Sequence, residues 1–135
     1  ITVDATTFEP QILICAAGAS RRMAPDDKLM LPLQGRPLLR HMAKRVLEIS
    51  VPTLVALPPE PHPRWHAVED LPLRKISYPE SAEGLSGTLR AAVADLPPTV
   101  THLCVVLADL PELAPVDFAQ LFEHRRQYAN CLIWR

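Results

Sequence analysis

The sequence predicts an α/β fold in three layers, with helices on both faces of a mostly parallel sheet. Short apolar runs alternate along the chain with segments in which apolar residues recur every three or four positions. Such alternation of strands and helices is typical of βαβ units, which build parallel sheets. The runs at residues 11–16 and 103–108 are almost continuously apolar, as expected of central strands covered on both faces.

The remaining elements follow in order along the chain. Further strands are expected at residues 53–57, 73–77 and 131–134. Helical spacing covers residues 38–49, 85–96 and 118–128, and a shorter helix is expected at 64–70. Pro37 suits the start of the first helix, and Ser86 is a candidate cap for the helix at 85–96. The chain stops soon after its fifth strand-like run, which is abrupt for a finished domain.

Composition narrows the class of protein. With 135 residues, 48% of them apolar and 21% charged, the chain suits a single globular domain. A net charge of −1 gives no basic surface for nucleic acid or membranes, and no apolar run approaches the roughly 18 residues of a membrane span. Cys15, Cys104 and Cys131 form no Cys-x-x-Cys pair. We expect them to be buried thiols in a reducing cytoplasm.

Prolines separate the apolar runs rather than interrupt them. Their densest group, at positions 58, 59, 61 and 63, predicts a surface turn. His62 lies within this group and His66 follows it, at a spacing of four residues. Because the neighbouring prolines disfavour a helix that carries both histidines, a surface loop is expected there rather than a metal site.

The connection after the first strand, residues 17–35, is the strongest functional signal. It has about 19 residues, whereas such connections usually have about 2–6. Its small residues allow backbone N–H groups to approach a ligand closely, and Arg22 and Lys28 add cations, so the segment predicts a phosphate-binding loop. It matches neither the P-loop nor the dinucleotide-binding glycine pattern. Asp26 and Asp27 either form a turn or position Lys28.

Two more segments fall where parallel sheets bind ligands, beyond the carboxyl ends of strands. Gly84, Leu85 and Ser86 open the third helix, so they form a turn with a cap, a ligand contact, or both. Asp109 follows the fourth strand, where its carboxylate either holds a hard cation such as Mg²⁺ or makes a turn.

These three segments carry a family resemblance. Residues 13–39 read LICAAGASRRMAPDDKLMLPLQGRPLL and resemble the opening signature of the MobA-like nucleotidyltransferases, above all the molybdenum cofactor cytidylyltransferases. Residues 81–94 resemble the family's Glu-Gly-Leu-Ser segment, and residues 105–111 resemble its Gly-Asp-Met-Pro segment. Ala24 and Ala108 stand where the family has glycine. The three segments occur in the family's order within residues 12–113.

The resemblance implies a Rossmann-like sheet of the nucleotide-diphospho-sugar transferase type, incomplete at its C-terminus. Residues 1–135 would be the N-terminal, nucleotide-binding portion of one nucleotidyltransferase domain. Arg22, Lys28 and Asp109 would act in catalysis, with Asp109 as the Mg²⁺ ligand. The phosphates would lie on Ala16, Ala17, Gly18, Ala19 and Ser20, and the base or ribose on Gly84, Leu85 and Ser86.

The implied reaction moves CMP from CTP to the phosphate of a molybdopterin-type acceptor and releases pyrophosphate. A molybdoenzyme would then be a client of the product, and neither nucleic acid nor a membrane would be a partner. Two alternatives stay open. One is a guanylyl or sugar-phosphate nucleotidyltransferase of the same fold, and the other is a non-catalytic module that binds a nucleotide or handles the cofactor.

Overall fold

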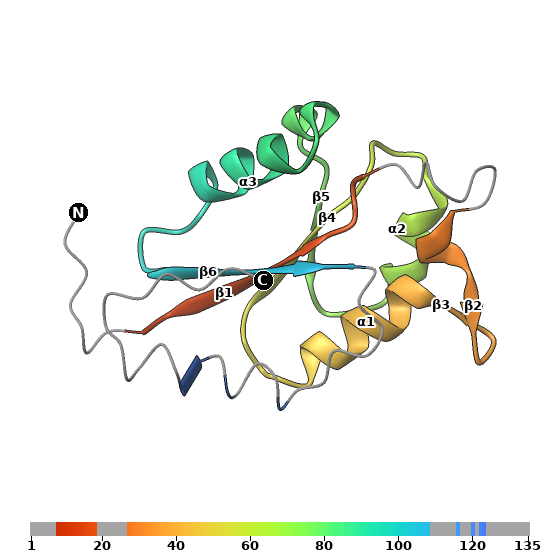
Figure 1. Ribbon diagram of the computed structural model, residues 1–135, viewed down its shortest axis with the longest axis horizontal. Coiled ribbons are helices and arrows are strands. Elements are labelled where there is room, and N and C mark those ends of the chain that lie inside the picture. The colour runs from red at the N-terminus through yellow and green to blue at the C-terminus, as the bar shows by residue number, and fades with distance from the viewer. Residues whose placement is uncertain (1–7, 19–26, 109–115, 117–119, 121, 124–135) are drawn as a thin grey trace.

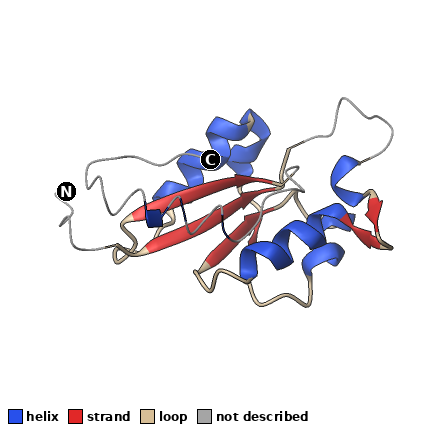
Figure 2. Ribbon diagram, turned by 60° about the horizontal axis from the view of Figure 1, so that its bottom comes forward, coloured by secondary structure: helices blue, strands red, loops and turns tan. Residues whose placement is uncertain are grey.

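The computed structural model describes residues 8–18, 27–108, 116, 120, 122 and 123. Its main sheet has four parallel strands in the order β5-β4-β1-β6. These strands are β1 (Pro10–Cys15), β4 (Thr53–Ala56), β5 (Arg74–Ile76) and β6 (His102–Leu107). The helices are α1 (Leu38–Leu47), α2 (Pro63–Val68) and α3 (Leu85–Ala94), and they lie on both faces of the sheet (Figures 1 and 2). The predicted fold class is confirmed.

Strand β1 lies at the point where the direction of the chain through the sheet reverses. From β1 the chain passes through α1 to β4 and on to β5 on one side. It then returns through α3 to β6, which pairs with the other side of β1. Ile12 of β1 therefore lies between Thr53 of β4 and Cys104 of β6. In open parallel sheets, ligands bind at such a reversal, beyond the carboxyl ends of the two strands.

Alternate residues of β1 enter two separate cores, because successive side chains of a strand point to opposite faces. Ile12 and Ile14 pack on the face covered by α1 and α2, together with Leu39, Met42, Val46 and Val68. Leu13 packs on the face covered by α3, together with Leu54, Tyr78 and Ala92. Burial on both faces explains why β1 is almost continuously apolar, as its sequence predicted.

The predicted elements within the described residues match the structure to within about two residues, which is the usual uncertainty of helix boundaries. The expected strand at 131–134 and most of the helix at 118–128 lie outside the described residues, although Val116, Gln120, Phe122 and Glu123 are helical. Cys104 is buried, as expected, whereas Cys15 is only half-buried, and burial raises the pKa of each thiol to about 11. Cys131 lies outside the described residues.

Two expectations were wrong in detail. Ser86 does not cap α3, because Gly84 occupies the N-cap position with φ of 99°, and Ser86 lies inside the helix. Glycine fits there because residues Pro79–Glu83 form a short 3-10 helix, η3, and the chain must turn sharply between η3 and α3. The second concerns His66, which lies on α2, in agreement with the short helix expected at 64–70, rather than in the surface loop expected for the two histidines.

Helix α2 forms within the proline-rich segment because Pro63 occupies its first turn, where no N–H bond is lost. His62 is its N-cap, and its Nδ1 accepts a hydrogen bond from the Arg64 N–H at 3.1 Å. Among the described residues, no three His, Cys, Asp or Glu side chains form a metal-binding group. Nor is any described helix long and apolar enough to cross a bilayer.

The long connection after β1 contains structure that its sequence did not predict. The 3-10 helix η2 (Lys28–Met30) is followed by an antiparallel hairpin of β2 (Pro32–Leu33) and β3 (Arg36–Pro37). Gln34 and Gly35 join the strands with φ of 53° and 79°. Positive φ at both positions is the geometry of a two-residue hairpin turn, and glycine at the second position is its sequence signal.

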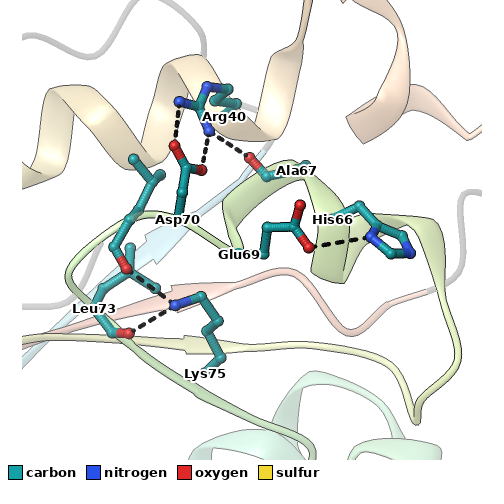
Figure 3. A network of polar contacts seen from close by, with 8 residues as sticks. Arg40, His66, Ala67, Glu69, Asp70, Leu73 and Lys75 are labelled. Atoms are coloured by element: carbon teal, nitrogen blue, oxygen red, sulfur yellow. Dashed lines mark hydrogen bonds and ion pairs between the residues drawn. The ribbon is translucent and has the colours of Figure 1, made fainter.

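A polar network joins α1 to the end of α2 (Figure 3). The Arg40 guanidinium donates to both carboxylate oxygens of Asp70, at 2.6 and 3.0 Å, and to the Ala67 carbonyl oxygen at 3.3 Å. The hydrogen bonds from Arg40 lower the pKa of the Asp70 carboxyl to about 2.

We expect Gly87→Ala to destabilise the protein. A Cβ atom at this buried position of α3 would lie 1.9 Å from the Glu80 carbonyl oxygen of η3, so the backbone must shift. Overpacking of this kind costs about 1–3 kcal/mol, whereas glycine to alanine within an exposed helix normally gains about 1 kcal/mol. Urea unfolding measures the difference, with Val93→Ala at an exposed position of α3 as the control. A Gly87→Ala protein as stable as the parent would contradict the packing described.

We expect the effect of Asp70→Asn on stability to depend on pH. The pKa of Asp70 is about 2 in the folded chain, against about 3.9 when unfolded, so its ionised form favours folding above pH 3.9. This contribution is lost as the pH falls towards 2. The melting temperature of Asp70→Asn should lie slightly below that of the parent at neutral pH, and the difference should shrink below about pH 4. A difference that stays constant between neutral pH and pH 3 would contradict the ion pair with Arg40.

Candidate functional site

The candidate site lies at the carboxyl ends of β1 and β6, where the strand order reverses. The Ala108 N–H, directly after β6, donates to the Cys15 carbonyl oxygen at 3.3 Å. The Ala16 N–H, directly after β1, donates to the Ala56 carbonyl oxygen of β4 at 2.9 Å. The start of the predicted phosphate-binding loop is thus held between its two neighbouring strands.

Residues 16–18 pass from the core to the surface within three positions. Ala16 is buried among the residues of the α1 face, and Ala17 packs against the cluster on the α3 face. Gly18 is exposed, and nothing lies within 4 Å of where its Cβ would be. An open glycine at the edge of a sheet leaves its backbone accessible to a ligand.

Arg64 of α2 contacts both the start of this loop and Asp27 further along it, although it is distant in sequence. The residue is 2% exposed. Its Nη1 donates to the Ala16 and Gly18 carbonyl oxygens, at 2.7 Å each. Its Nε and Nη2 donate to the two carboxylate oxygens of Asp27, at 2.8 and 2.9 Å. No buried side-chain nitrogen or oxygen among the described residues lacks a hydrogen-bond partner.

Asp27 connects Arg64 to the segment that carries Lys28. It is the N-cap of η2, where its Oδ1 accepts a hydrogen bond from the Leu29 N–H at 3.1 Å. Burial opposes the ionisation of Asp27, but the hydrogen bonds and positive charge of Arg64 outweigh it and lower the pKa of the carboxyl. Lys28 is half-buried and begins η2. Asp27 therefore fits both roles that its sequence left open, as a turn former and as an anchor for the lysine segment.

The second predicted segment, residues 84–86, lies at the same edge of the sheet, on the α3 face, because η3 and α3 follow the carboxyl end of β5. Gly84, Leu85 and Ser86 are all exposed. The Gly84 carbonyl oxygen accepts the first helical hydrogen bond, from the Thr88 N–H at 3.2 Å. The first N–H groups of a helix have no partner within it, so they are available to an acceptor.

The predicted site residues therefore fall into three groups. Ala16, Ala17 and Gly18 are joined to the Lys28 segment through Arg64 and Asp27. Gly84, Leu85 and Ser86 lie at the same edge on the other face. Ala19, Ser20, Arg22 and Asp109 lie outside the described residues.

Arg64 is the residue that sequence reasoning missed. Its signal was weak but present, because Arg64 occupies the same helix face as Ala67 and Val68, three and four positions on, and all three are buried. A charged residue on an apolar helix face must find buried partners. The sequence could not identify these partners, because Asp27 is 37 residues away from Arg64.

Several solved structures share this fold. A nucleotidyl transferase from Methanothermobacter thermautotroptrophicus is 22% identical with a TM-score of 0.76, over 86% of this chain and 57% of that chain. Rv0371c from Mycobacterium tuberculosis is 20% identical with a TM-score of 0.76, over 90% of this chain and 63% of its own, and is also known in complex with manganese. A CMP:2-keto-3-deoxy-manno-octonic acid synthetase complexed with CTP is 20% identical with a TM-score of 0.75, over 90% of this chain and 49% of that one.

Likeness at these identities establishes the fold, and the chain spans less than two thirds of the length of each of these proteins. Among curated proteins, none matches the chain. The model of the MobA-like NTP transferase domain matches residues 12–135, which is nearly the whole chain and includes all three segments of the candidate site. The chain therefore belongs to the MobA-like NTP transferase domain family.

Proposed function

We propose that this chain is the nucleotide-binding part of a nucleotidyltransferase, which transfers a nucleoside monophosphate from its triphosphate to a phosphate group and releases pyrophosphate. One observation carries the proposal. The loop after β1 leaves the sheet where the strand order reverses, and it is tied there to the segment of Lys28. Family membership supports the same reaction class.

The reaction does not require a strong general base from the protein. An acceptor phosphate already carries an anionic oxygen, which attacks the α-phosphorus while the bond to the β-phosphate oxygen breaks and pyrophosphate leaves. The protein must hold these groups in line and offset the charge that gathers on pyrophosphate. Backbone N–H groups of Ala17, Gly18, Ala19 and Ser20, next to Ala16, would bind phosphate oxygens, and Arg22 and Lys28 would stabilise the leaving group.

CTP is the favoured nucleotide, and a molybdopterin-type molecule the favoured acceptor. The support is the resemblance of residues 16–18 and 83–86 to the cytidylyltransferases of the family. One protein of the same fold is complexed with CTP. Gly84, Leu85 and Ser86 would contact the base or ribose, since these residues are exposed at the start of α3. A molybdoenzyme would be the client of the product.

A divalent cation, Mg²⁺ by preference, would be held by Asp109. The donor chemistry of Asp109 fits such an ion, because hard cations select carboxylate ligands. Asp109 directly follows Ala108, whose N–H is bonded to the end of β1. Because Mg²⁺ is commonly bound by one or two carboxylates together with substrate phosphates, triphosphate oxygens would complete the coordination. When bound, such a cation offsets negative charge on the phosphates. A protein of the same fold is known with manganese.

We expect CTP with Mg²⁺ to raise the melting temperature of the protein more than GTP, ATP or UTP does. A ligand that binds only the folded state stabilises it in proportion to its occupancy. Differential scanning fluorimetry with each triphosphate, with and without EDTA, makes the comparison. A larger shift with GTP would favour the guanylyl alternative. A shift without pyrophosphate release from the full-length protein would favour the non-catalytic module, and no shift with any triphosphate would refute nucleotide binding.

We expect Lys28→Ala to lower the rate of pyrophosphate release on the order of 10²–10³-fold, since a positioned charge on the leaving group is removed. The assay uses the full-length protein with CTP and the acceptor. Lys44→Ala, on the exposed side of α1, is the matched control and should leave the rate unchanged. An unchanged rate in Lys28→Ala would remove this lysine from the mechanism.

A further inference from the structure

We infer that Arg64 is a positioning residue, which sets the separation between the start of the phosphate-binding loop and the segment of Lys28. The inference rests on the proposed function. Arg64 makes four hydrogen bonds of 2.7–2.9 Å, two to the loop's first carbonyl groups and two to the Asp27 carboxylate. The Arg64 side chain thus bonds both segments, and it has no role in the reaction proposed above.

The shape of the guanidinium explains why an arginine is needed. Its donors lie in one plane at fixed angles, so the two Asp27 oxygens and the two carbonyl oxygens must lie around that plane together. A lysine at the same place would supply a single charged nitrogen without this geometry. The contacts therefore fix where residues 16–18 lie relative to the N-cap of η2, and Lys28 follows that cap directly.

The contacts also set the orientation of the loop's peptide groups. The Ala16 carbonyl oxygen points at Arg64. In a trans peptide the N–H lies opposite the carbonyl, so the Ala17 N–H points away from Arg64. A phosphate bound by this N–H would therefore lie on the side of the peptide opposite Arg64, whose charge is already paired with Asp27. By donating to the Ala16 and Gly18 carbonyl oxygens, Arg64 holds the start of the loop with the Ala17 N–H facing away from the guanidinium.

Local structure holds Arg64 itself in place. The His62 imidazole accepts the Arg64 N–H at 3.1 Å, and Pro63 begins the helix. The Trp65 indole donates to the Pro58 carbonyl oxygen at 2.7 Å, which ties the start of α2 to the end of β4 and its following turn. The guanidinium therefore projects from a fixed backbone towards the carboxyl edge of the sheet.

A second arginine offers a matched comparison. Arg40 also forms a two-bond pair with an aspartate and bonds a carbonyl oxygen, but these bonds join α1 to the α2 region (Figure 3). The side chains of its pair are 17% and 61% exposed, against 3% and 25% for Arg64 and Asp27. A buried ion pair gives little net stability over apolar packing, so its specific use is the geometry it imposes.

The test compares Arg64→Lys and Asp27→Asn with the control variants Arg40→Lys and Asp70→Asn. Binding of Mg²⁺–CTP and of CMP to the full chain is measured by calorimetry. CMP lacks the two outer phosphates, so it depends less on the loop and on Lys28. We expect both site variants to weaken CTP binding by about tenfold or more and CMP binding by less than about threefold, with the controls unchanged. The double variant should bind CTP little worse than the more affected single variant, because one interaction is removed.

Hydrogen exchange of residues 16–18 and 27–30 gives a readout that needs no nucleotide. Both site variants should exchange faster there while α1 and α3 keep their protection, and Arg40→Lys should not change these segments. Equal losses for CTP and CMP, or unchanged exchange in a folded Arg64→Lys protein, would overturn the inference. If the parent protein binds no triphosphate, the proposed function fails, whereas the exchange experiment still decides whether Arg64 positions the loop.

Discussion

The structure depends on β1 being enclosed on all four sides. It pairs with β4 and β6, and its side chains enter a separate core on each face of the sheet. The residues that follow β1 therefore leave the sheet at its carboxyl edge, between β4 and β6. The chain then crosses first to one side of β1 and later to the other, so this edge is the reversal point at which parallel sheets bind ligands.

Charge and hydrogen bonding at Arg64 organise the loop that follows β1. Residues that leave a buried strand expose backbone carbonyls at the margin of the core, and an unsatisfied carbonyl there costs free energy. Arg64 satisfies two of them, and its own buried charge is balanced by Asp27. Asp27 in turn caps the short helix that begins at Lys28. One guanidinium thereby links the core, the loop and the cation that would face the phosphates, and its positive charge keeps Asp27 ionised.

Nucleotidyl transfer to a phosphate suits a site of this construction. The reaction requires placement and charge compensation more than proton transfer, and both can be supplied by backbone amides and cations on a rigid support. Cys15 and Cys104 lie in β1 and β6, where burial raises the pKa of each thiol to about 11 and so disfavours the thiolate form. The chain spans less than two thirds of the length of the proteins described above that share its fold.

The sequence by itself determined the layers, the order of strands and helices, and the family. Continuous apolar runs mark the buried strands, Pro37 marks the start of α1, and the three motifs indicate the family, because each signal is local. Tertiary structure decided the rest. Gly84 rather than Ser86 caps α3 because η3 leads directly into it. The pairing of Arg64 with Asp27 and with the loop carbonyls joins residues tens of positions apart, and only the packing of α2 against the sheet edge brings them together.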